Sequence, residues 1–215
     1  MIFNAMKYKH IIWDFNGTIL DDAWLCVEVL CGLLKKRNMP PITLDEYQQL
    51  FDFPVIDYYR KIGFNFDKES FDIIADEYIA AYEAEMHNCK LRDGIIEMMD
   101  KIKSSHQSQS VLSAAHQDSL EKALTDLSLM PYFTHVAGLG DYYAHSKIDV
   151  GHKLMAQLEL NSDQVLLIGD TTHDFQVATQ IGADCVLIPG GHQTKQRLIA
   201  CGAKICDSMA DINFD

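Results

Sequence analysis

The chain has 215 residues, of which 48% are hydrophobic and 23% are charged, and its formal net charge is −13 at pH 7. These values are close to those of globular proteins and exclude bulk disorder and a collagen-like architecture. The length fits one domain with an insertion, or two small domains. An acidic surface repels nucleic acid and anionic membranes, so we expect neither as a partner.

The cysteines and the apolar runs give an expectation for the cellular compartment of the protein. Six cysteines are present and none forms a CxxC pair, which favours free thiols in a reducing compartment over a zinc site. The N-terminal segment lacks the long apolar stretch of a secretory signal, and no apolar run approaches the roughly 18 residues of a membrane span. We therefore expect a soluble, cytoplasmic monomer or homodimer.

Short apolar runs alternate with longer amphipathic stretches over most of the chain. The runs are continuous rather than alternating, as expected for parallel strands covered on both faces. Strands are predicted at 10–14, 108–113, 135–138, 165–169, 185–188 and, more weakly, 204–206. Helices are predicted between them at 94–103, 118–127, 149–158, 174–181 and 192–200. This order predicts an α/β fold with a Rossmann-like, doubly wound parallel sheet.

Residues 21–88 interrupt the alternation with a run of helical patterns and no convincing strand. Apolar residues recur at helical spacing over 23–36, Thr43 and Glu46 form a capping signature, and further helices are expected at 54–62 and 66–85. We therefore predict a core domain of residues 1–20 and 89–215, with a helical-bundle cap domain of residues 21–88 inserted after the first core strand.

Two predicted strands end at acidic residues. The first runs into Asp14, followed by Asn16 and Gly17, and the second runs into Asp170, followed by Asp174. Ligands of open α/β sheets bind beyond the carboxyl ends of the strands, where such carboxylates can lie side by side. Their mutual repulsion favours a hard divalent cation, and magnesium suits few carboxylates plus phosphate oxygens. Each motif can also be an ordinary turn, and Asp174 can simply cap a helix.

Two further residues are candidates for binding an anion. Ser113 ends another predicted strand, where its hydroxyl and nearby backbone N–H groups can hold a phosphate. Lys147 precedes a predicted helix and can supply a positive charge. Taken alone, each is more often an ordinary strand-end serine or a solvated lysine.

These four motifs, in this order, resemble those of the haloacid dehalogenase superfamily. The nucleophile loop corresponds to residues 14–18, the small hydroxyl residue to Ser113, the lysine to Lys147 and the acidic loop to residues 170–174. The helical segment after the first motif is similar to the cap of the phosphoglycolate phosphatase-like branch, as are the Phe-Asp-Phe-Pro run at 51–54 and the segment at 58–63. The likeness extends over nearly the whole chain.

The resemblance implies a metal site and a nucleophile. It implies that Asp14 attacks phosphorus and becomes an aspartyl phosphate. It also implies that magnesium is held by the Asp14 side chain, the backbone carbonyl of Asn16 and Asp170, with Asp174 binding through water or orienting the other ligands. The cation neutralises nucleophile and phosphate, so two anions can meet.

The same resemblance assigns the groups that bind the transferring phosphate. Ser113, Lys147 and the backbone N–H groups near Phe15 and Ala114 would contact the phosphoryl oxygens. Phosphoryl transfer depends mainly on positioning and charge stabilisation, so this set suffices for the attack.

Residue 16 departs from the family pattern. Its members usually have an aspartate there, which protonates the leaving group and then activates water, whereas this chain has Asn16. An amide has no proton to exchange at neutral pH. General acid–base catalysis is worth about 10²–10⁴-fold, so the loss matters least for leaving groups that need little protonation, such as aryl or acyl phosphates. His116 or His173 could replace the missing group, although either can be a surface histidine.

We therefore predict a magnesium-dependent phosphatase for a small phosphorylated metabolite, acting through a phosphoenzyme at Asp14 and slowed by Asn16. The alternatives are a phosphotransferase or mutase and a non-catalytic protein that binds phosphorylated ligands. In the cap, residues 51–54 and 58–61 are plausible substrate contacts. Arg60 and Lys61 either bind a second anionic group or face solvent.

Overall fold

A computed structural model describes residues 2–140 and 147–214. Its centre is a parallel sheet with strand order β6-β5-β2-β7-β8-β9, in which strands from both halves of the chain lie side by side. The strands are β2 (His10–Trp13), β5 (Ser108–His116), β6 (His135–Leu139), β7 (Val165–Gly169), β8 (Asp184–Leu187) and β9 (Lys204–Ile205). The predicted α/β class and parallel sheet are confirmed.

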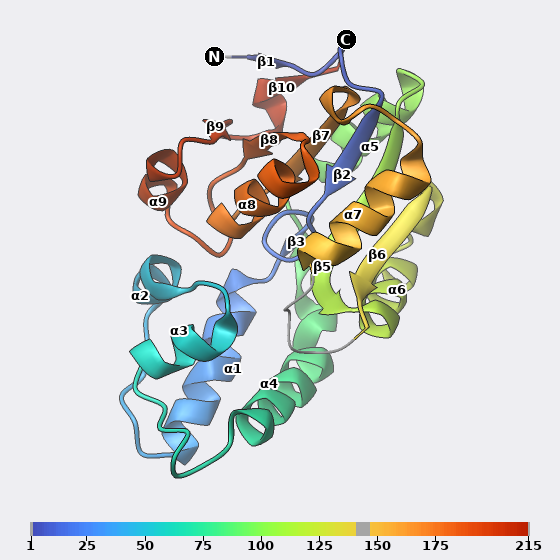
Figure 1. Ribbon diagram of the computed structural model, residues 1–215. Coiled ribbons are helices and arrows are strands. Elements are labelled where there is room, and N and C mark those ends of the chain that lie inside the picture. Colours follow the sequence, from blue (N-terminus) through green and yellow to red (C-terminus); the bar gives the residue numbers. More distant parts are fainter. Residues whose placement is uncertain (1, 141–146, 215) are drawn as a thin grey trace.

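Helices cover both faces of this sheet (Figure 1). On one face, Ile12 of β2 packs with apolar residues of α7 (Lys147–Leu158) and α8 (Thr172–Ile181). On the other face, Ile11 and Trp13 pack toward α5 (Ile95–Ser104) and α6 (Gln117–Asp126). Successive residues of a strand point to opposite faces, so both faces need apolar residues and the strand sequences read as continuous runs. The last helix, α9 (Lys195–Ala200), lies next to β9.

Residues 23–88 form helices that lie at the end of the molecule opposite the two termini (Figure 1). They are α1 (Ala23–Lys36), α2 (Leu44–Leu50), α3 (Val55–Lys61), α4 (Phe71–Glu85) and the short 3-10 helix η1 (Met86–Asn88). Thr43 and Glu46 form the predicted capping box at the start of α2. Arg37 links the loop before α4 to α4 itself, because its guanidinium donates to both Glu69 and Glu77.

Four two-residue strands of the described chain were not predicted, although the equally short β9 was. Residues Leu20–Asp21 (β3) pair antiparallel with Lys90–Leu91 (β4), at the two points where the chain enters and leaves the helical segment. Near the termini, β1 (Phe3–Asn4) pairs with β10 (Ile212–Asn213). Strands of two residues carry no periodic pattern that a sequence can reveal. The remaining elements are the 3-10 helices η2 (Met130–Tyr132), η3 (Ser162–Gln164) and η4 (Met209–Asp211).

Several predicted boundaries shift; the helix expected at 192–200, for example, begins at Lys195. The helix expected from residue 66 begins at Phe71, because the side chain of Asn65 accepts a hydrogen bond from the N–H of Asp67 and holds a turn there. Strand β5 continues to His116, with an irregular register after Leu112. Among the described residues, no helix combines the length and apolar character that crossing a membrane requires.

Candidate active site

The carboxylates predicted at two strand ends lie together. Strands β2 and β7 are neighbours with Trp13 opposite Ile168, so Asp14 and Asp170 emerge at the same edge of the sheet. The N–H of Asp14 donates to the carbonyl of Ile168 at 2.9 Å, which keeps the two strands paired up to the site. Carboxylate oxygens of Asp14, Asp170 and Asp174 all lie within 4.8 Å of one another, and all three residues are buried.

Lys147, the first residue of α7, lies between two of these carboxylates. Its Nζ is 2.6 Å from Oδ1 of Asp14 and 2.6 Å from Oδ1 of Asp174. Only 3% of the lysine side chain is exposed, so the ammonium depends on these partners. Burial lowers the pKa of Lys147, but the two carboxylates outweigh burial and raise it, so the lysine stays charged.

The three carboxylates differ in their surroundings. Burial and the charge of Asp174 raise the pKa of Asp14, and the Lys147 ammonium opposes them only in part. Burial also raises the pKa of Asp170. For Asp174, burial is outweighed by the Lys147 ammonium and by hydrogen bonds from Lys147 and Thr171, so its pKa is lowered. Three carboxylates against one lysine leave an excess of negative charge in a buried place.

Asp170 is held in place by the turn after β2 and by the loop after β8. Its Oδ1 lies 2.9 Å from Oγ1 of Thr18, and its Oδ2 accepts a hydrogen bond of 2.6 Å from the N–H of His192. Gly17 has a φ of +74°, and a Cβ there would collide with the Asp170 carboxylate. A Cβ on Gly191 would collide with the same carboxylate. The two glycines therefore allow the backbone to approach Asp170 closely.

Asp174 caps a helix, as the sequence allowed, and also contacts Lys147 in the site. It completes a capping box at the start of α8, where its Oδ2 accepts from the N–H and the hydroxyl of Thr171, at 3.0 and 2.6 Å. Its other oxygen, Oδ1, contacts Lys147. One carboxylate thus starts a helix and faces the site.

Ser113 also lies at this edge of the sheet. Its Oγ accepts a hydrogen bond of 3.0 Å from the N–H of Ala115, which leaves the hydroxyl proton available to a ligand. Ser113, Ala114 and His116 line the same cavity as Asp14 and Lys147. His173 lies differently, since its ring stacks on Phe53 of the helical segment with centroids 4.5 Å apart. It is not among the lining residues, and burial lowers its pKa.

Asn16 faces a buried aspartate. Its Nδ2 donates to Oδ2 of Asp22 and to the hydroxyl oxygen of Tyr82, both at 2.8 Å. The Tyr82 hydroxyl in turn donates to Asp22 at 2.6 Å. Asp22 directly precedes α1 and Tyr82 lies on α4, so the side chain of residue 16 is hydrogen-bonded to the helical segment.

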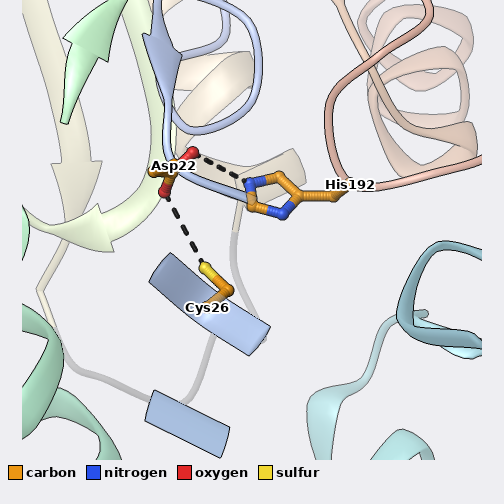
Figure 2. A group of neighbouring side chains, drawn as sticks. All are labelled: Asp22, Cys26 and His192. Atoms are coloured by element: carbon orange, nitrogen blue, oxygen red, sulfur yellow. Dashed lines mark hydrogen bonds and ion pairs between the residues drawn. The ribbon is translucent and has the colours of Figure 1, made fainter. Parts of the chain in front are cut away.

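Figure 2 shows Asp22 with Cys26 and His192, whose potential ligand atoms lie close enough for a metal ion. Oδ1 of Asp22 accepts from the N–H of Gly17 at 2.8 Å and lies 3.3 Å from Nε2 of His192. Burial lowers the pKa of His192, but Asp22 outweighs burial and raises it to about 9, whereas burial raises the pKa of the Cys26 thiol. We interpret this group as an ion pair between Asp22 and His192, with the Cys26 thiol 3.9 Å from the Asp22 carboxylate.

A cavity of about 480 Å³ extends from these residues into the helical segment. Its inner end contains Asp14, Asn16, Ser113, Lys147 and Asp174. Its walls are mainly aromatic and aliphatic side chains of α1–α4 and the loops between them, including Phe51, Phe53, Pro54, Tyr58 and Tyr59 from the two predicted cap segments. Arg60 and Lys61 are not among its lining residues.

Residues 11–188 match the model of the haloacid dehalogenase-like hydrolases. The chain belongs to this family. It is therefore a hydrolase by family, and the phosphoglycolate phosphatases among its relatives support the predicted phosphatase. Phosphoglycolate phosphatase of Synechococcus elongatus is 22% identical over 207 residues, with 94% of each chain covered.

Another relative is longer than this chain and is named for a different activity. Tyrosine-protein kinase PtkA of Mycobacterium tuberculosis is 25% identical over 188 residues, which are 85% of this chain and 62% of PtkA. This chain thus spans less than two thirds of that relative. Among solved structures, a haloacid dehalogenase-like hydrolase of Streptococcus pneumoniae matches with a TM-score of 0.82 at 19% identity, covering 95% of this chain and 96% of the other. This likeness shows the fold of the family.

Phosphatases of this family generally use a divalent metal ion, and the residues of this chain fit one. Asp14, Asp170 and Asp174 supply hard oxygen ligands, which magnesium and calcium prefer. The excess of negative charge around Lys147 is the observation that favours a cation here, because buried like charges otherwise repel one another.

Six of the site residues named from the sequence line one cavity: Asp14, Asn16, Ser113, Ala114, Lys147 and Asp174. The seventh, Asp170, is not a lining residue, but its carboxylate lies within 4.8 Å of those of Asp14 and Asp174. The segment just before Lys147, residues 144–146, lies outside the described residues. Three contributors were missed: Thr18, Asp22 and His192. Thr18 was within the quoted nucleophile loop. His192 follows two glycines after a predicted strand, which is the same signal of a polar residue near a strand end that identified Asp14.

Proposed function

We propose that this protein is a magnesium-dependent phosphatase that hydrolyses a small phosphorylated metabolite through an aspartyl phosphate on Asp14. The observation that carries the proposal is the buried group of Asp14, Asp170, Asp174 and Lys147 where β2 and β7 end. Membership of the hydrolase family and the phosphoglycolate phosphatase relatives support the same reaction.

Magnesium would be held by the Asp14 carboxylate, the backbone carbonyl of Asn16 and the Asp170 carboxylate, with Asp174 orienting the shell. When bound, it would supply the positive charge that lets an anionic phosphate approach an anionic nucleophile. The fixed position of Asp170, between Thr18 and the N–H of His192, would hold this ligand without rearrangement.

The chain's own residues would carry out two displacements at phosphorus. An Asp14 oxygen attacks phosphorus, the bond to the leaving alcohol oxygen breaks, and that oxygen takes a proton from solvent. Water then attacks the same phosphorus, the bond to Asp14 breaks, and inorganic phosphate and the carboxylate are released. Lys147 and the Ser113 hydroxyl, with the backbone N–H groups of Phe15 and Ala114, would bind the phosphoryl oxygens during both steps.

We also propose that residues 21–88 act as a cap over a core of residues 1–20 and 89–215. The cavity walls from α1–α4 support this division, because substrate bound there would be shielded from bulk water. In keeping with the composition, we propose a cytoplasmic monomer or homodimer without nucleic-acid or membrane partners; all six cysteines are free in the structure.

The test is hydrolysis of phenyl phosphate with and without magnesium. We expect turnover that requires the metal and that falls by at least about 10³-fold in Asp14→Asn, since removing a covalent nucleophile is among the most damaging changes. Asp163→Asn, an exposed aspartate away from the cavity, is the matched control and should keep its activity. A fully active Asp14→Asn protein would refute the proposal.

A second candidate is transfer of the phosphoryl group from Asp14 to an acceptor other than water. Two observations favour it: Asn16 provides no base for water, and one relative is named as a tyrosine-protein kinase. In this case the phosphoenzyme would persist in buffer and decay when an alcohol or phenol acceptor is added. Binding of phosphate esters without any phosphoenzyme would instead indicate a non-catalytic ligand-binding protein.

A further inference from the structure

The cavity continues from the phosphate end into a region walled by aromatic rings. Phe51 packs edge-on against Phe53 and Tyr58, each with ring centroids 5.4 Å apart, and Tyr59, Phe71 and Tyr78 line the wall farther along the helical segment. Aromatic rings of this kind bury much apolar surface and bind other rings in edge-to-face or offset geometry. The part of the substrate beyond phosphorus therefore meets an apolar, ring-lined space.

A second anionic group on the substrate finds little to bind. Among the described lining residues, Lys147 is the only lysine or arginine, and it is paired with Asp14 and Asp174. The His192 ring also lines the cavity, but it is paired with Asp22. Arg60 lies on the surface, where it contacts Asp57 at 2.6 Å. Two acidic residues, Asp72 and Glu83, line the wall instead. Like charges in such a space repel a carboxylate or a second phosphate.

Asn16 imposes a matching restriction on the leaving group. Both hydrogens of its amide are used by Asp22 and Tyr82, and the amide has no proton to give. A phenol has a pKa of about 10, so its oxygen leaves as the anion far more readily than an aliphatic alcohol oxygen does. The unassisted cleavage that this site offers is therefore best suited to esters of phenols.

From the cavity wall and Asn16 together, we infer that the substrates are phosphomonoesters of phenols and other aromatic alcohols, with no second anionic group. The inference rests on the proposed phosphatase function and specifies its substrate class. The ring occupies the space between Phe51 and Tyr78, and the phosphate lies at Asp14, Ser113 and Lys147.

Three phosphate esters test the effect of the aromatic wall and the effect of Asn16 separately. Ethyl, benzyl and phenyl phosphate are compared in magnesium buffer with the wild-type protein. Benzyl and ethyl phosphate have similar leaving oxygens and differ by a ring, so we expect a KM for benzyl phosphate lower by about tenfold or more. Phenyl and benzyl phosphate both carry a ring and differ in leaving group, so we expect kcat/KM, which reports the step that releases the leaving group, to be higher for phenyl phosphate by about 10²-fold.

A variant pair tests where the ring binds. Ala75 lines the cavity from α4, and Ala75→Phe fills part of the proposed ring site. We expect the KM advantage of benzyl over ethyl phosphate to disappear in this variant. Ala80→Phe makes the same change at an exposed position of the same helix and should keep the advantage.

The outcomes distinguish an error in the proposed substrate class from an error in the proposed phosphatase function. Higher kcat/KM for phosphoglycolate than for benzyl phosphate, or an unchanged benzyl preference in Ala75→Phe, overturns the substrate class and leaves the phosphatase proposal standing. If the folded protein hydrolyses none of these esters with magnesium, the phosphatase proposal itself is wrong.

Discussion

At the scale of single residues, the contacts of Asn16 explain why an amide suits this position. Its Nδ2 donates to Asp22, which already receives hydrogen bonds from Gly17 and Tyr82 and lies beside His192. An aspartate at residue 16 would place a second carboxylate within hydrogen-bond distance of Asp22 in a buried place. Such a pair is costly unless one of the two carries a proton.

This arrangement predicts different outcomes for a single and a double substitution. Asn16→Asp alone should lower the free energy of unfolding by about 1–3 kcal/mol, because one hydrogen bond is replaced by repulsion. Asn16→Asp with Asp22→Asn restores an amide–carboxylate hydrogen bond in the reverse direction and puts an acid at residue 16. In the double variant we expect kcat/KM for benzyl phosphate to rise by about 10²-fold, with little gain in kcat/KM for phenyl phosphate, whose leaving group needs little protonation.

Urea unfolding and steady-state kinetics on both variants check this pair of expectations. Asp22→Asn alone is the control that separates loss of the Asp22 charge from gain of an acid. If the double variant is folded and hydrolyses benzyl phosphate no faster than wild type, then the missing acid does not limit the reaction.

Residue chemistry also determined how much of the site the sequence could predict. Asp14, Ser113 and Asp170 were identifiable because each ends an apolar strand, and parallel strands end at one edge. Asp22 carried no such signal, and His192, which follows a predicted strand, was not selected on that signal. Their roles depend on contacts between segments 170 residues apart in the chain, made by the fold and not by local sequence.

At the scale of elements, the turn after β2 determines how closely two parts of the site approach. Gly17 combines a φ of +74° with contact to the Asp170 carboxylate and the His192 ring. By contrast, Gly32 lies in the middle of α1, and a Cβ there would meet nothing within 4 Å. The backbone at Gly17 therefore requires a glycine, whereas the surroundings of Gly32 do not. The sequence alone does not show this difference.

Alanine substitutions at these two positions should have opposite effects. Gly17→Ala should destabilise the protein by at least about 1–3 kcal/mol and abolish hydrolysis, because the backbone strain and the displaced Asp170 act together. Gly32→Ala should stabilise it by about 0.5–1 kcal/mol, since alanine is the better helix former, and should leave hydrolysis unchanged. Thermal unfolding measures both, and equal stability of the two variants would contradict this account of the turn.

Helices and strands long enough to show a repeating hydrophobic pattern were predictable, and most of the two-residue strands were not. The helix at Ala23–Lys36 and the capping box at Thr43 follow from local patterns and caps. The pairing of Leu20–Asp21 with Lys90–Leu91 does not, because two residues show no alternation and their partner lies across the whole helical segment. This pairing nevertheless joins the entry and exit of that segment.

At the scale of the whole molecule, an acidic chain with a net charge of −13 must attract a phosphate ester. The structure concentrates this difficulty at one place, where Lys147 contacts two of three buried carboxylates but supplies only one positive charge, and a cation would offset the remaining negative charge. The α/β class could be inferred from the alternating pattern, and residues 51–54 and 58–61 were expected as substrate contacts. The rest of the aromatic wall, such as Tyr47, Phe71 and Tyr78, could not be predicted, because it combines side chains of separate helices.

The central claim is that Asp14 forms a covalent bond to phosphorus. The most direct measurement is mass spectrometry of protein quenched in acid during turnover of phenyl phosphate with magnesium, followed by peptide mapping. The account predicts the added mass of one phosphoryl group on the peptide that contains Asp14, dependent on magnesium and absent in Asp14→Asn. A phosphoryl group on another residue, or steady turnover with no labelled protein when the second step is slowed by cooling, would contradict it.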